Sequence, residues 1–294
     1  MAEARIDVAG DPSGGAGGDA QLRRFVLERH PVRGFWTRLD AAWRELHGFQ
    51  HYPPAVQALL GEAVTASVLL AATLKFDGTL SLQLQGNGAV RLLVAQCTHD
   101  LRIRAVARME PGAAVSAGVE AGGAAAGFRE LVGRGGRMAV TVEAEERAAR
   151  YQGIVALEGE SLAACLEHYF ATSEQLPTRI ALAAWEDLQA GVASLPGPLL
   201  RSGQAEQVLQ RVCGEHEARL FAPAPVRFGC RCNPGRVAGL LRALGTQEVR
   251  ALLAEQGAVT VTCEFCGRPY RFDAVDAERV LADGAQPAGP QSVN

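Results

Sequence analysis

The chain has 294 residues, of which 48% are hydrophobic and 21% are charged, and its formal net charge at pH 7 is -3. This length is sufficient for one large domain or two smaller domains with a buried core. So small a net charge gives no overall reason to expect a nucleic acid or an anionic membrane as partner. The longest apolar stretch, residues 63–74, is shorter than the roughly 20 residues of a membrane helix, and no secretory signal begins the chain. We therefore expect a cytoplasmic protein without a membrane contact.

Residues 1–20 are rich in glycine, with Gly-Gly-Ala-Gly-Gly at 14–18, and predict a disordered leader because they have little to bury. Strands are predicted around 25–27 and 32–36, with Gly34 as a bulge or turn, and a short helix at 40–46.

The most regular helical pattern follows Pro53 and Pro54, which are tolerated in a first helical turn. Apolar residues recur there at the spacing of one helical face and predict a central core helix that ends before Lys75. These residues are Val56, Leu59, Leu60, Ala63, Val64, Val68 and Ala71.

After this helix the apolar period changes to two, which indicates antiparallel strands. A second long helix is predicted at 160–172, with Ser161 as its cap, and a loop at 111–127. Strands and helices in this order indicate an α+β fold for an N-terminal domain of residues 21–184. We interpret the arginines on the strand at 101–107 as a solvent-exposed strand face rather than as a binding surface. The predicted strands span residues 79–85, 90–95, 101–107, 138–143, 150–155 and 180–184.

Residues 185–228 form a linker that is interrupted by glycine and proline but contains one amphipathic helix. Val208, Leu209, Val212 and Cys213 lie on its apolar face, and Gly214 ends it. So short a helix is marginal alone, so the linker must pack on a neighbour to stay folded and is expected to be metastable.

Four of the seven cysteines are clustered in residues 229–274, as Cys230-Arg231-Cys232 and Cys263-Glu264-Phe265-Cys266. Between them, helices are predicted at 234–244 and 247–256 and a strand at 258–262, and residues 275–294 are a C-terminal tail. Such a unit is too small to bury an adequate core. Four thiolates around one Zn²⁺ would supply the missing stability, so we predict a small zinc domain with Cys230, Cys232, Cys263 and Cys266 as metal ligands.

Three other classes of protein also use clustered thiols. An inert zinc ribbon that binds nucleic acid is motivated by the arginines beside the cysteines and on the strand at 101–107. A dithiol oxidoreductase is disfavoured because the residues after Cys266 do not begin a helix. A zinc deaminase is disfavoured because Thr262 stands where its motif has proline.

The sequence resembles the redox-regulated 33-kilodalton heat-shock chaperonin family from Leu22 to about Val280. Its zinc centre is similar to the two cysteine pairs, with Phe265 inside the second. Family blocks in the N-terminal domain agree with this: Val32-Arg33-Gly34, Tyr52-Pro53, Leu60-Gly61-Glu62, Leu74-Lys75-Phe76, Leu84-Gln85-Gly86, Tyr151-Gln152-Gly153-Ile154-Val155, Tyr169-Phe170 and Ser173-Glu174-Gln175-Leu176-Pro177-Thr178.

The resemblance implies a non-enzymatic holding chaperone that works without ATP. It implies that the reduced form binds one zinc ion, and that oxidation forms the disulfides Cys230-Cys232 and Cys263-Cys266 with loss of zinc. The linker then unfolds and exposes apolar surface to unfolded client proteins. The implied partners are these clients, a second copy in an oxidised homodimer and an ATP-dependent foldase downstream. Cys97, Cys165 and Cys213 match no family ligand, and we interpret them as packing cysteines.

Overall fold

The computed structural model describes residues 6–8, 20–113, 115, 124–144, 150–183, 205–213 and 216–283. The chain divides into two compact units, Met1–Gly229 and Cys230–Asn294. Each unit combines helices with antiparallel strands, which confirms the α+β class.

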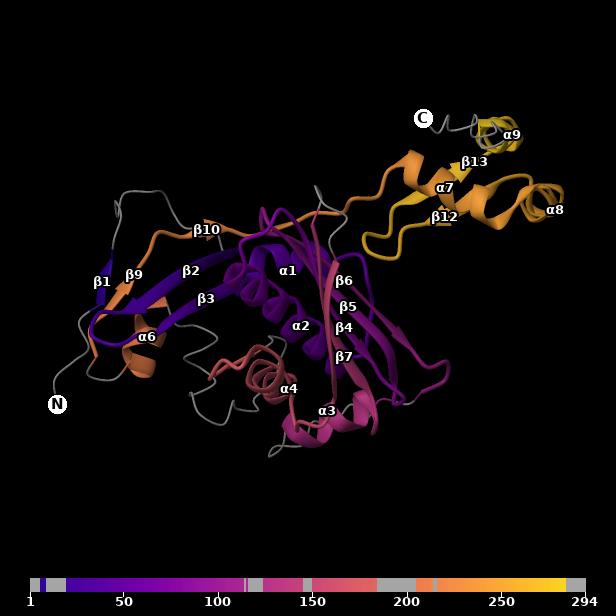
Figure 1. Ribbon diagram of the computed structural model, residues 1–294. Helices are drawn as coiled ribbons and strands as arrows, with labels where there is room; N and C mark the ends of the chain where they lie inside the picture. Colours follow the sequence, from indigo (N-terminus) through magenta and orange to yellow (C-terminus); the bar gives the residue numbers. More distant parts are fainter. Residues whose placement is uncertain are drawn as a thin grey trace, which may run out of the picture. The chain divides into compact units, whose positions relative to one another are not determined.

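A six-stranded sheet forms the centre of the first unit, and α2 (Pro54–Thr73) lies along one of its faces (Figure 1). Its strands alternate in direction except for the last one along the chain, which pairs in parallel at one edge. The strand order is β11 (Arg227–Phe228), β6 (Arg102–Met109), β5 (Val90–Thr98), β4 (Gly78–Gln85), β7 (Arg137–Ala144) and β8 (Arg150–Ala156).

The core of this unit lies between α2 and the sheet. Leu80, Leu82 and Leu84 alternate on β4 with partly exposed residues and are fully buried, as the period of two predicts. By length and composition α2 could cross a membrane, and it is longer than the apolar stretch noted in the sequence. However, 61% of that span is buried within the fold, so α2 is the predicted core helix.

A second sheet is built from both ends of the first unit. The hairpin of β2 (Ala20–Leu27) and β3 (Arg33–Leu39) pairs with short strands that come from the predicted linker. β9 (Ala218–Leu220) and β10 (Ala224–Pro225) share the other edge of β2, and β1 (Ile6–Val8) pairs in parallel with β9. The expectation of a disordered leader therefore does not hold for these three β1 residues, because β9 offers their backbone a strand partner. Residues 1–5 and 9–19 lie outside the described part of the chain.

The linker helix α6 (Ala205–Cys213) packs on this second sheet. Val208, Leu209 and Cys213 are buried against Trp36 of β3, as the amphipathic pattern predicts. Val212, by contrast, is 52% exposed and does not join the contact. The rest of the linker before residue 205, and Gly214, lie outside the described residues.

Gly34 is neither a bulge nor a turn, which corrects the expectation. It lies inside β3 directly opposite Phe25 of β2, and a Cβ at this position would be 2.1 Å from the Phe25 ring. Glycine is needed there because the aromatic ring of the neighbouring strand covers the backbone.

The helix α1 (Asp40–His47) agrees with the sequence. α3 (Ala124–Val132) begins inside the predicted loop, most of which lies outside the described residues. The second long helix is α4 (Leu162–Tyr169), capped by the Ser161 hydroxyl as predicted, and continues as the π-helical turn η1 (Phe170–Glu174). The strand predicted at 180–184 is wrong for 180–183, which have no strand partner in the described part of the chain, although Leu182 is buried.

The second unit contains α7 (Pro234–Leu244), α8 (Thr246–Gln256) and the hairpin of β12 (Val259–Thr262) and β13 (Pro269–Phe272). The positions of α7, α8 and β12 agree with the sequence prediction. The final helix, α9 (Ala274–Asp283), corrects the expectation that a tail begins at residue 275. Its residue Ala277 is fully buried with Leu241 and Val249, so α9 belongs to the small core of this unit.

Candidate metal centre

The four clustered cysteines come from two places in the second unit. Cys230 and Cys232 precede α7, whose first turn is fixed because the Asn233 side chain accepts a hydrogen bond from the Arg236 N–H at 2.9 Å. Cys263 and Cys266 lie in the turn that connects β12 to β13. The two cysteine pairs are therefore presented by a helix start and by a hairpin turn.

The hairpin turn is closed by the backbone. The Cys263 N–H donates to the Arg268 carbonyl at 2.9 Å, and the Gly267 N–H donates to the Cys263 carbonyl at 2.8 Å. Gly267 has a φ of 64°, a conformation that glycine adopts without a Cβ penalty. This glycine directly after Cys266 lets the chain reverse while both sulfurs face the same side.

The four Sγ atoms lie within 4.8 Å of one another. Cys230 and Cys263 have their Sγ atoms 3.6 Å apart, and Cys232 and Cys266 have theirs 3.3 Å apart. Four sulfurs placed tetrahedrally at about 2.3 Å from one Zn²⁺ would be about 3.8 Å from each other. The donor set and its spacing therefore fit a tetrathiolate metal site.

Burial and hydrogen bonds shift the pKa values of Cys230, Cys232 and Cys266 in different directions. Burial works against ionisation of Cys232, but hydrogen bonds from Tyr270, Cys266 and Cys230 outweigh it and lower its pKa to about 7. Burial raises the pKa of Cys266 to about 12, and it also raises that of Cys230. A bound cation would reverse this by favouring the thiolate at every position.

Tyr270 is a residue of the site that the sequence did not reveal. Its hydroxyl donates a hydrogen bond to the Cys232 Sγ at 3.1 Å, and its ring is buried in the core of the unit. It lies on β13 directly opposite Val261, whereas Cys232 precedes α7, so the contact joins the hairpin to the segment before α7. The one signal in the sequence was an aromatic residue soon after the second cysteine pair.

Arg268 is the arginine whose pKa responds to the cluster. The largest cause that raises its pKa is a hydrogen bond with Tyr270, and the charges of Cys232 and Cys266 raise it further. Arg236 instead donates to the Arg231 carbonyl at 3.0 Å. Arg268 thus offsets the negative charge of the cysteines, whereas Arg236 fixes the backbone at Arg231.

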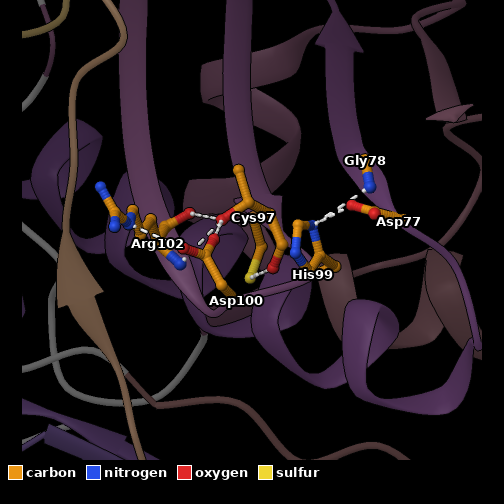
Figure 2. A network of polar contacts seen from close by, with 7 residues as sticks. Asp77, Gly78, Cys97, His99, Asp100 and Arg102 are labelled. Atoms are coloured by element: carbon orange, nitrogen blue, oxygen red, sulfur yellow. Dashed lines mark hydrogen bonds and ion pairs between the residues drawn. The ribbon is translucent and has the colours of Figure 1, made fainter. Parts of the chain in front are cut away.

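The other three cysteines lie in the first unit and are buried. Cys165 lies on the buried face of α4 and Cys213 is the buried last residue of α6, and burial raises the pKa of both thiols. Cys97 points inward at the end of β5, where Figure 2 shows it beside the turn to β6. Burial and then the nearby Asp100 raise its pKa to about 12. Such thiols are poor nucleophiles, which agrees with their interpretation as packing residues.

Comparison with known proteins identifies the family. The model of the Hsp33 protein family matches residues 20–200 and 186–273. The 33 kDa chaperonin of Nitrosococcus oceani is 37% identical over 284 residues, which cover 89% of this chain and 94% of that protein. The 33 kDa chaperonin of Pseudomonas paraeruginosa is 38% identical over 300 residues, which cover 92% of this chain and 97% of that protein.

The fold agrees with a solved structure of the same name. The crystal structure of the 33 kDa chaperonin from Thermotoga maritima matches with a TM-score of 0.74 and 21% sequence identity. The match covers 90% of this chain and 98% of that one. The chain therefore belongs to the Hsp33 family of 33 kDa chaperonins.

Proposed function

We propose that this chaperone is a redox-regulated holdase that acts in the cytoplasm without ATP and catalyses no reaction. Its switch is the cluster of Cys230, Cys232, Cys263 and Cys266, which holds one zinc ion in the reduced, inactive form. The observation that carries the proposal is the convergence of these four Sγ atoms within 4.8 Å in a unit with a small core.

Metal binding supports the fold of this second unit. When bound, Zn²⁺ contributes folding free energy, on the order of 10–16 kcal/mol in small zinc peptides. The core between α7, α8, α9 and the hairpin is limited, with Leu241, Val249 and Ala277 as its fully buried residues. Loss of the four thiolates therefore removes a large share of the stability of the unit.

Oxidation removes the thiolates two at a time. For each disulfide, two thiolates lose two electrons and an S–S bond forms between their sulfurs. Hydrogen peroxide accepts the two electrons together with two protons from the solvent, its O–O bond breaks and two waters result. We propose the pairs Cys230-Cys232 and Cys263-Cys266, so the full switch consumes two peroxide molecules. A disulfide sulfur is a poor metal ligand, so the metal-supported fold is lost together with the ligands.

The linker transmits this change to the first unit. Residues 185–228 form the switch linker and residues 21–184 the chaperone domain. The described end of the linker covers apolar residues of that domain: α6 lies on Trp36, and Val226 is buried in the main core. Release of these segments exposes apolar surface to which unfolded clients bind. An oxidised homodimer presents two such surfaces, and an ATP-dependent foldase later receives the clients.

The proposal is tested by following zinc and chaperone activity together. Reduced protein and peroxide-treated protein are compared for bound zinc by elemental analysis and for suppression of aggregation of thermally denatured citrate synthase. We expect the wild type to lose zinc and to gain suppression of aggregation together on oxidation. Cys165→Ala should behave in the same way. Cys232→Ser should retain little zinc even when it is reduced. Oxidised, zinc-free protein that fails to suppress aggregation would refute the proposed function.

The disulfide pairs are tested separately by peptide mass spectrometry of the oxidised chain. Cys230-Cys232 and Cys263-Cys266 are expected. Because the reduced cluster brings Cys230 close to Cys263 and Cys232 close to Cys266, these crossed pairs are the specific alternative. Finding them as the main products would overturn the pairing but leave the switch in place.

A further inference from the structure

The edge of β6 is the place where the linker joins the central sheet. β11 pairs in parallel with β6 through two residues, with Arg227 opposite Arg102 and Phe228 opposite Ile103. The Arg227 N–H donates to the Leu101 carbonyl at 3.1 Å, and the Gly229 N–H donates to the Ile103 carbonyl at 3.0 Å. The linker thus covers this edge as a short added strand.

The continuation of the same edge is covered by side chains. The Gln50 side chain donates to the Ala105 carbonyl at 3.1 Å. The Tyr52 hydroxyl donates to the Ala107 carbonyl at 2.9 Å and accepts from the Ala107 N–H at 3.0 Å. Uncovered strand edges pair readily with other chains. Among the described residues, Gln50 and Tyr52 protect the edge at Ala105 and Ala107, and β11 protects it at Leu101 and Ile103.

The acceptors under β11 are held by the first unit itself. In the turn after β5, the Thr98 hydroxyl donates to Asp100 and accepts from the Arg102 N–H at 3.0 Å, and Asp100 pairs with the Arg102 guanidinium at 2.8 Å (Figure 2). Leu101 has a φ of 60°, which a leucine adopts only when its surroundings impose it. The Leu101 carbonyl therefore keeps its position when β11 leaves.

β11 is weakly held compared with the edge that it covers. It has only two paired residues, and its apolar anchors are Val226, which is 3% exposed, and Phe228, whose ring centroid lies 5.5 Å from that of Phe49. Phe49 is already 46% exposed beside it. The chain continues from Gly229 directly into Cys230, so unfolding of the second unit frees the end of β11.

We propose that the edge of β6 vacated by β11 is a docking site for an extended apolar segment of an unfolded client, which adds to the sheet as a strand. This rests on the proposed function and assigns it a surface. The client's backbone N–H groups replace those of Arg227 and Gly229, and one apolar side chain replaces Phe228 against Phe49. Main-chain hydrogen bonds are independent of side-chain identity, which suits a holdase that receives many different sequences.

The first test uses a photoreactive benzoylphenylalanine in place of Phe49. The matched control carries it in place of Ile154, which is 55% exposed on β8 at the opposite edge of the same sheet. Each variant is irradiated in its reduced form and in its oxidised form. Reduced and alkylated α-lactalbumin is present as a permanently unfolded client. We expect client crosslinks at position 49 to rise several-fold on oxidation and those at position 154 to stay low.

A second test needs no variant. Ala107 directs its N–H to the β11 edge, so Ile103 and Ala105, which share its parity, do so as well. In peptide-level hydrogen exchange of the wild-type chain, oxidation should speed exchange in residues 101–106. Addition of α-lactalbumin should restore protection there and leave residues 150–156 of β8 unchanged.

The two tests distinguish a failure of the docking site from a failure of the proposed holdase function. If the oxidised protein suppresses aggregation but position 49 does not crosslink the client and residues 101–106 gain no protection, the edge is not the docking site and the proposed function stands. Crosslinks that join two copies of the chain in place of the client would also overturn the inference. If suppression itself is absent, the proposed function fails and this inference fails with it.

Discussion

The Tyr270 hydroxyl on β13 donates a hydrogen bond at 3.1 Å to the Sγ of Cys232, which lies just before α7. This contact stabilises negative charge on one sulfur of the cluster, whether that sulfur is free or bound to a metal. It therefore connects the core of the second unit with the chemistry of its thiols, since the same ring packs among the core residues.

Replacement of Tyr270 by phenylalanine should weaken zinc retention by roughly tenfold, because loss of a hydrogen bond to a ligand typically lowers metal affinity by this order. The ring stays, so the core keeps its packing. Competition of the reduced protein with a chromogenic chelator measures the effect. Tyr151→Phe, on β8 in the first unit, is the control and should retain zinc as the wild type does. Equal retention in Tyr270→Phe would show that the hydroxyl has no role in the site.

Glu206→Gln should loosen the linker helix α6 without changing the cluster of Cys230, Cys232, Cys263 and Cys266. Arg23 is buried, and its guanidinium pairs with Glu206 at 2.7 Å and donates to the Phe221 carbonyl at 3.1 Å. Removal of the carboxylate leaves a largely buried charge without its counter-ion and should cost about 1–3 kcal/mol of local stability. Faster hydrogen exchange in residues 205–213 of the reduced protein is the expected result. Arg29 forms an exposed ion pair with Glu217 at 3.6 Å, so Glu217→Gln is the matched control and should change little.

Glu62 should make the first unit less stable as the pH rises. Burial on α2 raises the pKa of this carboxyl to about 7, above its value of 4.5 in an unfolded chain. Between these two pH values the folded state holds a proton that the unfolded state has lost. The stability contribution is complete below pH 4.5 and is lost as the pH rises through 7.

The difference corresponds to at most about 3 kcal/mol. Glu62→Gln should remove this pH dependence from denaturant unfolding of the first unit and stabilise the protein at pH 8. A pH dependence identical to that of the wild type would contradict the assignment to Glu62.

Gly34→Ala should destabilise the β2–β3 hairpin, because the new Cβ would lie 2.1 Å from the Phe25 ring. Overpacking of this kind costs about 1–3 kcal/mol. Thermal unfolding measures the loss, and the double variant Phe25→Leu with Gly34→Ala should recover part of it. Gly135→Ala is a contrasting variant, since nothing lies within 4 Å of its Cβ position although its φ of 82° adds strain. Failure of the Phe25 change to rescue Gly34→Ala would exclude a steric origin.

Periodicity in the sequence predicted the elements that depend on their own residues. The apolar run of α2 and the alternation on β4 both carry their own signal, because α2 is buried around much of its circumference and β4 buries every second residue. The four cysteines were predicted from their spacing and from the family resemblance, and the fold brings all four together.

The elements that were missed depend on distant partners. β1, β9, β10 and β11 have only two or three residues each and exist as strands because another strand offers them hydrogen bonds. Conversely, residues 180–183 have strand-like composition but no strand partner in the described part of the chain. Tyr270 contacts Cys232 only because β13 lies beside the segment before α7, and no local sequence pattern encodes this contact.

The pairing of β2 with β9 and β10 has a consequence for synthesis of the chain. Val26 pairs with Arg219 and Leu22 pairs with Ala224, so one edge of an early strand waits for residues made in the last third of translation. At 5–20 residues per second this interval lasts roughly 10–40 s. During that time Trp36 has no α6 to cover it. In a ribosome-bound nascent chain, the edge of β2 and the Trp36 side chain are thus exposed before any oxidant acts. They become covered only when the last third of the chain has been made.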